Sequence, residues 1–202
     1  MAEITAGQVK TLREATGAGM MDCKKALQEA DGDMARATEI LREKGLASSA
    51  KRAGRSADQG LIDSYIHFNN TVGVLIEVNC ETDFVANTDR FRALVKDLAL
   101  HIASPAAPIY LSREQVPQDV VDQESKIAET QAREARKPDN VIAKIIEGKV
   151  ASYYKDTVLL EQPFVKDDSK TVQQLLEETS AAVGEKVAVR RFVRYKLGEE
   201  GS

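Results

Sequence analysis

The sequence contains few residues that could carry out covalent chemistry. It has two histidines, His67 and His101, and two cysteines, Cys23 and Cys80, among 202 residues. Neither histidine belongs to a recognisable catalytic pattern, and we expect both at the surface or at the rim of the fold. A cysteine nucleophile needs a base nearby, and the residues around Cys80 supply none. We therefore expect Cys80 to be a small buried side chain at a strand end and both cysteines to be reduced.

Motifs for metal and phosphate binding are also missing. The sequence has no HExxH, no paired CxxC, no EF-hand loop and no phosphate loop of the G-x-x-x-x-G-K-S/T type. Gly17-Ala18-Gly19 follows an expected helix, so we interpret it as a turn between helices. Glu81, Asp83 and Asp89 could be imagined as acid–base partners, but a helix N-terminus attracts acids for electrostatic reasons alone. We expect no enzyme activity, no metal and no cofactor.

Long apolar runs and an excess of basic charge are absent too. Charged residues interrupt every apolar stretch well before it could span a bilayer, and the first residues lack the pattern of an export signal. The net charge is −4 at pH 7, whereas general nucleic-acid or anionic-membrane binders carry the opposite sign. We expect no direct nucleic-acid partner, no membrane and a cytoplasmic location.

What is present is typical of a small folded protein, with 43% hydrophobic and 30% charged residues. The first 45 residues predict three short helices. Thr5 and Gln8 form a capping box, Gly17 ends the first helix, Asp33 caps the third, and Gly45 stands at its end. Helices this short are stable only when packed together, so we expect a compact bundle.

Composition then shifts to Ala, Ser, Lys, Arg and Gly. We interpret this stretch as a basic and partly helical tether in which Lys51, Arg52 and Arg55 are solvated. The predicted organisation is a three-helix module at 1–46, the tether at 47–59 and a core domain at 60–202.

After residue 60 the apolar pattern alternates with a period of two. One face of the first strand holds Ile62, Ser64, Ile66 and Phe68, and Asn69-Asn70 suits a tight hairpin turn. The second strand places Val72, Val74, Ile76, Val78 and Cys80 on one face. A final strand places Val187, Val189, Val193 and Tyr195 on alternate positions.

Helical patterns separate these strands. We expect a helix capped by Asn87 and ended by Pro105, a charged helix over 117–136, and another around 141–150. A short strand is expected at 157–160, followed by a helix that Ser169 caps and Gly184 ends. Together these elements predict an α+β fold in which helices cover an antiparallel sheet.

Two places suggest contact with a partner. Met20 and Met21 are adjacent on a thin helix, so both cannot be equally buried, and a flexible methionine at the surface is an adaptable contact. The alternative is that both methionines pack in the core or only occupy the start of the helix. Thr82-Asp83-Phe84-Val85 joins a strand to a helix, where an aromatic side chain could anchor a partner. Spacing alone favours Phe84 folding back onto its own sheet.

Three stretches resemble the elongation factor Ts family of bacterial type. They are LREATGAGMMDCKKAL at 12–27, EVNCETDFVA at 77–86, and QPFV at 162–165 followed by SKTV at 169–172. The resemblance extends from Ala2 to about Glu199.

The resemblance implies a ubiquitin-associated-like N-terminal module and a partner, elongation factor Tu, whose GDP release the family promotes without covalent chemistry. It also implies two groups of site residues. Residues that would intrude near the nucleotide and disturb its magnesium ion and phosphate-binding loop are Thr82, Asp83, Phe84 and Val85. Residues of the N-terminal module that would contact the nucleotide-binding domain are Leu12, Arg13, Met20 and Met21. The later core would contact a second domain of the partner.

The length of the chain departs from the longer family members, which carry a second copy-like half of the core and an inserted helical hairpin. At 202 residues the chain is too short for both, so it resembles the short form and we expect a homodimer through the core. The location implied is the cytoplasm, or the stroma or matrix of an organelle of bacterial descent. Two other functions remain open, namely a pure interaction module without exchange activity and a thiol enzyme built on Cys80.

Overall fold

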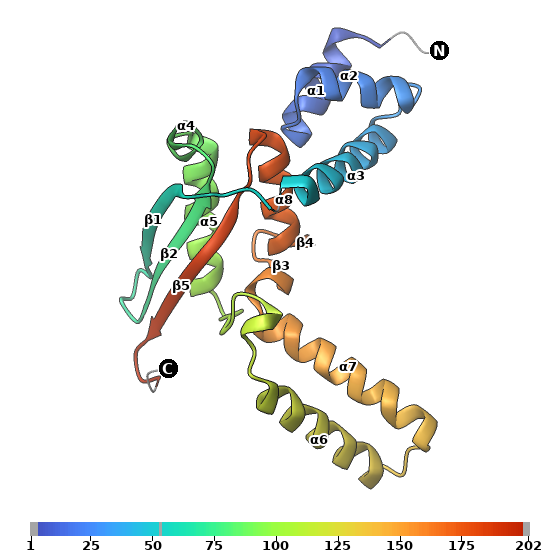
Figure 1. Cartoon of the computed structure of the whole chain (residues 1–202), viewed down its shortest axis with the longest axis vertical. Helices are drawn as coiled ribbons and strands as arrows, with labels where there is room; N and C mark the ends of the chain where they lie inside the picture. Colours follow the sequence, from blue (N-terminus) through green and yellow to red (C-terminus); the bar gives the residue numbers. More distant parts are fainter. Residues whose placement is uncertain (1–3, 53, 200–202) are drawn as a thin grey trace. The chain divides into compact units, whose positions relative to one another are not determined.

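The computed structural model describes residues 4–52 and 54–199, and it has the predicted α+β architecture (Figure 1). The chain forms two compact units. The first consists of Met1–Leu61, Val78–Ala93 and Gln174–Arg190, and the second of Ile62–Glu77, Leu94–Gln173 and Arg191–Ser202. The predicted division at residues 46 and 59 stays a prediction. In order, the helices and strands are α1 (Ala6–Thr16), α2 (Met20–Glu29), α3 (Met34–Arg52), β1 (Gln59–Ile66), β2 (Val72–Cys80), α4 (Asp83–Ala86), α5 (Asp89–Ala103), η1 (Arg113–Gln115), α6 (Gln118–Glu134), α7 (Asp139–Thr157), η2 (Leu159–Glu161), β3 (Pro163–Phe164), β4 (Asp167–Thr171), α8 (Val172–Val183) and β5 (Ala188–Lys196).

The three N-terminal helices form the predicted bundle. Thr5 and Gln8 make the capping box of α1, and Gly17 ends this helix in the left-handed conformation with φ of 69°. The core of the bundle consists of small and aliphatic side chains, namely Val9, Leu12, Cys23, Ala26, Leu27, Ala30, Ala37, Ile40 and Leu41. Each helix contributes a narrow apolar stripe, which is why the three helices are stable only together.

Helix α3 does not end at Gly45, contrary to the sequence prediction, and its backbone continues to Arg52. Gly45 does not adopt a positive φ, so it lowers helix propensity here without terminating the helix. The basic cluster is not simply solvated, because Arg52 is buried and Arg55 lies 3.3 Å from the Glu81 carboxylate. The side chain of Lys51 lies outside the described residues.

Strands β1, β2 and β5 form a three-stranded sheet in the order β1-β2-β5, while β3 and β4 form a separate antiparallel pair. The hairpin turn between β1 and β2 lies where it was predicted. Asn70 has a φ of 57°, and the Asn69 side-chain oxygen accepts a hydrogen bond from the Thr71 N–H at 3.1 Å. Asparagine tolerates this conformation better than other residues with a Cβ, which explains the position of the turn.

The two faces of the strands differ sharply in exposure. Val74, Ile76, Val78 and Cys80 are buried as predicted. The predicted single alternation along β5 is wrong, because Arg190 and Arg191 are both exposed and the pattern shifts by one residue between them. Upstream of the shift Val187 and Val189 are buried, whereas downstream of it Val193 and Tyr195 are exposed.

Two predicted helix caps and one predicted strand are also wrong. Thr88, not Asn87, caps α5, because its hydroxyl oxygen accepts a hydrogen bond from the Phe91 N–H at 3.3 Å. Residues 157–160 form no strand; α7 runs to Thr157 and only an isolated bridge joins Val158 to Tyr110. Ser169 lies inside β4 instead of capping α8. In each case a longer-range contact or a neighbouring polar residue replaces the local signal.

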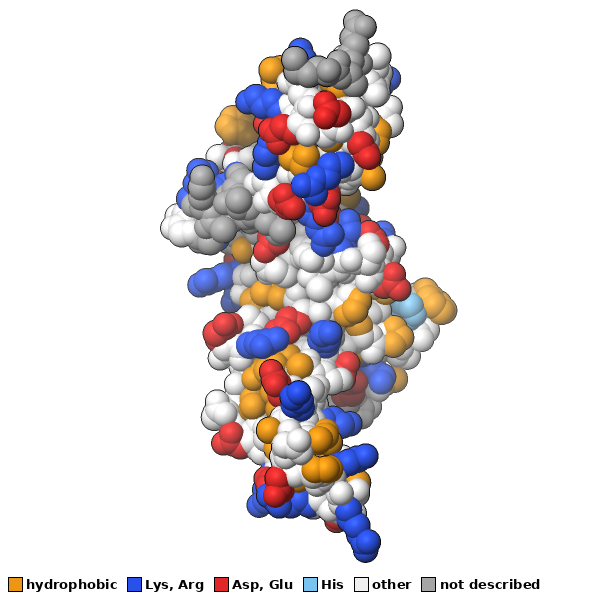
Figure 2. Space-filling model, turned by 90° about the vertical axis from the view of Figure 1, so that its right-hand side faces the viewer, with side chains coloured by type: hydrophobic (Ala, Val, Ile, Leu, Met, Phe, Trp, Pro, Cys, Tyr) orange, Lys and Arg blue, Asp and Glu red, His pale blue; other side chains and the backbone are white. Residues whose placement is uncertain are grey.

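Helices α6 and α7 form a hairpin in the second unit (Figure 1). Small side chains make their close approach possible, since Ala128 and Ala132 of α6 are buried, as is Ile142 of α7. Among residues 4–52 and 54–199, none of the helices combines the length and the apolar character needed to cross a bilayer. On the face drawn in Figure 2, Lys and Arg side chains lie interspersed with Asp and Glu side chains.

His101 is fully buried, contrary to the prediction of a surface or rim position. Its Nδ1 accepts a hydrogen bond from the Val165 N–H at 3.1 Å, so the proton lies on Nε2, which is 2.9 Å from the Gln162 side-chain oxygen. The Gln162 amide group donates to the carbonyls of Ala106 and Asp156. Burial lowers the pKa of His101, because a second proton would be desolvated and would face the Val165 N–H.

We expect acid to destabilise the second unit, which contains His101, because of this buried histidine. The folded-state pKa lies below the unfolded value near ~6.5, so on acidification the unfolded chain binds a proton that the folded chain does not. The free energy of unfolding should fall as the pH drops below ~6.5, with a slope approaching about 1.4 kcal/mol per pH unit. Urea unfolding at a series of pH values would measure this slope, and His101→Gln should flatten it. If the free energy of unfolding of the native chain does not change with pH below ~6.5, His101 is not a buried neutral histidine with a lowered pKa.

Candidate functional site

The stretch Thr82–Val85 forms a single helical turn whose aromatic side chain points away from the fold. Thr82 is the N-cap of α4, and its hydroxyl oxygen accepts a hydrogen bond from the Val85 N–H at 3.4 Å. Phe84 is 82% exposed, so the expectation that it folds back onto its own sheet is wrong. Asp83 beside it is also exposed, while Thr82 and Val85 are half-buried. The turn therefore presents one aromatic and one acidic group to solvent.

Cys80 lies directly before this turn and does not resemble a reactive thiol. It is fully buried, and its Sγ donates to the Thr82 carbonyl at 3.1 Å. Burial, together with the nearby Glu185 carboxylate, raises the pKa of Cys80. A nucleophilic cysteine needs a lowered pKa and solvent access, so the geometry argues against a thiol enzyme at this position.

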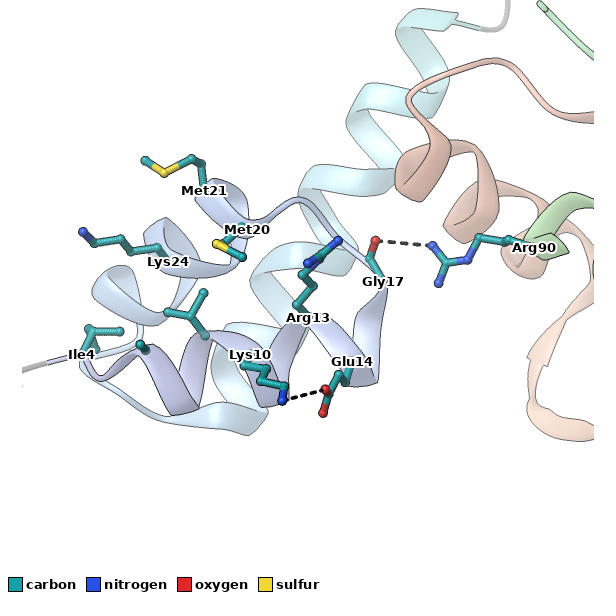
Figure 3. Close-up of a pocket in the computed structure, with 11 residues that line it drawn as sticks. Ile4, Lys10, Arg13, Glu14, Gly17, Met20, Met21, Lys24 and Arg90 are labelled. Carbon is teal, nitrogen blue, oxygen red and sulfur yellow. Dashed lines mark hydrogen bonds and ion pairs between the residues drawn. The ribbon is translucent and has the colours of Figure 1, made fainter. Parts of the chain in front are cut away.

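A second exposed surface lies on the N-terminal bundle. Met20 is 57% exposed and Met21 63% exposed, so both methionines reach the surface, where only one was expected. They line an open hollow of about 950 Å³ (Figure 3). The other lining residues include four cations, Lys10, Arg13, Lys24 and Arg90. Glu14 also lines the hollow and pairs with Lys10 at 3.8 Å (Figure 3). Apolar side chains with a mainly basic rim form the kind of surface that a protein partner contacts.

The structure brings together only some of the residues predicted for this surface. Arg13, Met20 and Met21 all line the hollow. Leu12, in contrast, is fully buried in the bundle core, so its side chain supports the surface from beneath instead of forming it.

Sequence reasoning missed two residues that the fold adds to these surfaces. Arg90 reaches the hollow from α5, and its Nη1 lies 3.4 Å from the Gly17 carbonyl (Figure 3). Glu185 contacts Thr82 although 103 residues separate them. No local pattern marks either one, because a salt-bridging or hydrogen-bonding charge looks the same in sequence as a solvated charge.

Within the described part of the chain, no group of three or more His, Cys, Asp or Glu side chains is arranged to hold a metal ion. The two prominent features are an exposed phenylalanine on a fixed turn and a methionine-rich hollow with a basic rim. Both are typical of a protein that acts by contacting another protein, and this defines its class.

Comparison with known proteins identifies the family. The family model described as Elongation factor TS matches residues 2–199. Elongation factor Ts of Geobacter metallireducens is 59% identical over 196 residues, which covers 97% of this chain and 90% of that protein. The Desulforamulus reducens protein of the same name is 56% identical over 98% of this chain and 91% of its own length, and that of Thermoanaerobacter sp. is 57% identical over 97% and 96%.

The chain belongs to the elongation factor Ts family. Family membership places it among the nucleotide-exchange factors of translation elongation, which act on elongation factor Tu and catalyse no covalent chemistry.

Both cysteines should be unreactive in the folded chain, because Cys23 and Cys80 are fully buried. We expect a thiol reagent such as dithionitrobenzoate to label each cysteine at least ~100-fold more slowly in the native protein than in urea. Mass spectrometry of digested samples would assign each label to its cysteine. Fast labelling of Cys80 in the native state would revive the thiol-enzyme hypothesis.

Proposed function

We propose that the chain accelerates GDP release from elongation factor Tu by inserting the turn Thr82–Val85 close to the bound nucleotide. The observation that carries this proposal is the 82% exposure of Phe84 on a turn with a fixed backbone. When a partner buries a large apolar side chain that was held in water, the free energy of the complex falls. Asp83 and Phe84 would intrude, with Thr82 and Val85 flanking them.

The target of the intrusion would be the magnesium ion and the phosphate-binding loop. In GTPases of this kind magnesium bridges the nucleotide oxygens and protein ligands, so displacing it weakens nucleotide binding. Burying one phenylalanine contributes roughly 1.5–3 kcal/mol. This offsets about one to two decades of nucleotide affinity, and the remainder comes from the wider interface.

The hollow on the N-terminal bundle would supply part of that wider interface. Arg13, Met20 and Met21 would contact the nucleotide-binding domain, with Leu12 supporting them from the core. The basic rim favours a partner surface that carries acidic side chains around an apolar centre. The later part of the core would contact a second domain of the partner.

Linkage limits what such a factor can do. Whatever the chain does to GDP affinity, GDP must do to the affinity of the chain for its partner. The chain would therefore speed exchange in either direction, and the concentrations of GTP and GDP would decide the outcome. The proposed location is the cytoplasm, or an organelle of bacterial descent.

We also propose a homodimer, supported by the outer face of the sheet in the second unit. Antiparallel sheets with one solvated face normally carry polar residues on it. Here that face and the turns that follow β1 and β5 expose large apolar side chains, namely Ile62, Ile66, Phe68, Leu75, Tyr195 and Leu197. A second copy of the chain would cover this surface through a two-fold interface.

Phe84→Ala tests the exchange mechanism. The rate at which a fluorescent GDP leaves elongation factor Tu, followed by stopped flow, should rise strongly with the native chain. The variant should lose about one to two decades of that acceleration, because the apolar contact is removed. Ile109→Ala, another exposed apolar residue, is the matched control and should behave like the native chain.

Other outcomes of this experiment would separate the remaining functions. Acceleration that survives Phe84→Ala would move the mechanism to the rest of the interface. Binding without any acceleration would leave a pure interaction module.

The dimer has its own test. Light scattering at micromolar concentration should give about twice the chain mass of 22.1 kDa, and Ile66→Lys should shift the protein to monomer, because a buried unpaired charge is costly. A native chain that scatters as a monomer would remove the dimer and leave the exchange function untouched.

A further inference from the structure

Glu185 connects the loop before β5 to the exchange turn, here defined as Thr82–Val85. Its Oε2 accepts hydrogen bonds from the Glu81 N–H at 3.1 Å and from the Thr82 N–H at 3.0 Å. Its Oε1 accepts a third from the Thr82 hydroxyl at 2.7 Å. One carboxylate thus binds three donors at the start of the turn, and hydrogen bonds to an ionised acceptor are the strong ones.

The connection also runs in the opposite direction. Glu81 Oε1 accepts a hydrogen bond from the Lys186 N–H at 2.6 Å, which together with Arg55 lowers the pKa of Glu81. The segments 81–82 and 185–186 are therefore joined by reciprocal hydrogen bonds. The Glu185 carboxylate accepts from backbone N–H groups of the first segment, and the Glu81 carboxylate accepts from a backbone N–H group of the second. A displacement of either segment would break bonds on both.

Glu185 is itself held in place by the end of α8. Gly184 takes a positive φ of 77°, which turns the chain out of the helix. The Ser180 hydroxyl donates to the Glu185 carbonyl at 2.6 Å, and Ser180 is buried. The carboxylate consequently reaches the exchange turn from a backbone that is already fixed.

Thr82 transmits this constraint to Phe84. Its hydroxyl hydrogen goes to Glu185, which directs the oxygen lone pairs of the same group toward the Val85 N–H that it caps. Helix α4 has only four residues, and such a turn is not stable without external support. The position of Phe84 at its centre therefore depends on the support that Glu185 gives to Thr82.

We propose that Glu185 is a positioning residue for nucleotide exchange: acting through Thr82, it holds the turn in the conformation in which Phe84 can enter the partner. The inference rests on the proposed function, since it names what prepares the same site. Glu185 need not touch the nucleotide or magnesium. Without it, the turn has to be ordered at the moment of insertion, and this ordering slows GDP release.

The test compares Glu185→Gln with the native full-length chain in the GDP-release assay. The glutamine side chain keeps one acceptor oxygen but loses the charge and the second acceptor. We expect the maximal rate at saturating factor to fall by about tenfold, while the half-saturating concentration stays within about twofold. Glu185→Ala should reduce the maximal rate further. Circular dichroism would show that the variants are folded.

A merely structural role predicts a different result. Loss of folded protein lowers the active concentration, which raises the apparent half-saturating concentration and leaves the maximal rate unchanged. Glu39→Gln is the matched control, because Glu39 is an exposed carboxylate of the same unit that pairs with Arg36. It should change neither parameter.

Double variants identify the path of the effect. Thr82→Val removes the hydroxyl from the other side of the contact, so it should lower the maximal rate. Combined with it, Glu185→Gln should have a smaller effect than in the native chain, because one of the three hydrogen bonds to Glu185 is already absent. Thr82→Val also keeps the test available if Glu185→Gln does not fold. In the Phe84→Ala chain, Glu185→Gln should reduce the residual acceleration of GDP release by less than about twofold, because the side chain that Glu185 positions is already absent.

Two failures are distinguishable. A native chain that does not accelerate GDP release would overturn the proposed function. If the native chain accelerates GDP release, either of two results would overturn only the positioning role of Glu185. One is a Glu185→Gln variant with the native maximal rate. The other is a Glu185→Gln effect that is as large in the Phe84→Ala chain as in the native chain.

Discussion

Two carboxylates hold the functional part of this fold together. Glu81 and Glu185 lie about a hundred residues apart, yet each accepts hydrogen bonds from the backbone next to the other. Backbone N–H groups at a strand end and in a loop have no partners within their own segments, so they need acceptors from elsewhere. Here each segment supplies the acceptor for the other. The same bonds that satisfy the two segments also fix the turn that carries the exposed Phe84.

Among the described residues, the exchange turn, the N-terminal hollow and the outer face of the sheet each keep large apolar side chains in water. Each place lies on an element whose opposite side is well packed. Phe84 follows a strand end fixed by Glu185, Met20 and Met21 stand on a helix whose other side fills the bundle core, and the outer sheet face backs a buried one. A rigid support lowers the ordering cost of binding, so exposed apolar groups on such elements are suited to partners.

Local signals identified most of the longer helices and strands but not their ends, and they predicted a strand at 157–160 that does not form. The capping box at Thr5 and the turn at Asn69-Asn70 involve neighbours in sequence, and both were predicted correctly. Gly45 and Ser169 also carry strong local signals, but the structure places them inside a helix and a strand. His101 was misplaced for a related reason. Its burial is possible only because Gln162 and Val165, more than sixty residues away, satisfy both ring nitrogens.

The sequence by itself determined the class of fold, the family resemblance and the stretch that holds the exchange turn. Alternation of period two, helical stripes and short motifs are all encoded by residues close to one another. The tertiary structure alone decided which apolar residues stay exposed, that Leu12 is buried while Met20 and Met21 are not, and that Glu185 supports Thr82. The physical reason is that burial and hydrogen-bond partners are properties of contacts between distant segments, and no single segment carries that information.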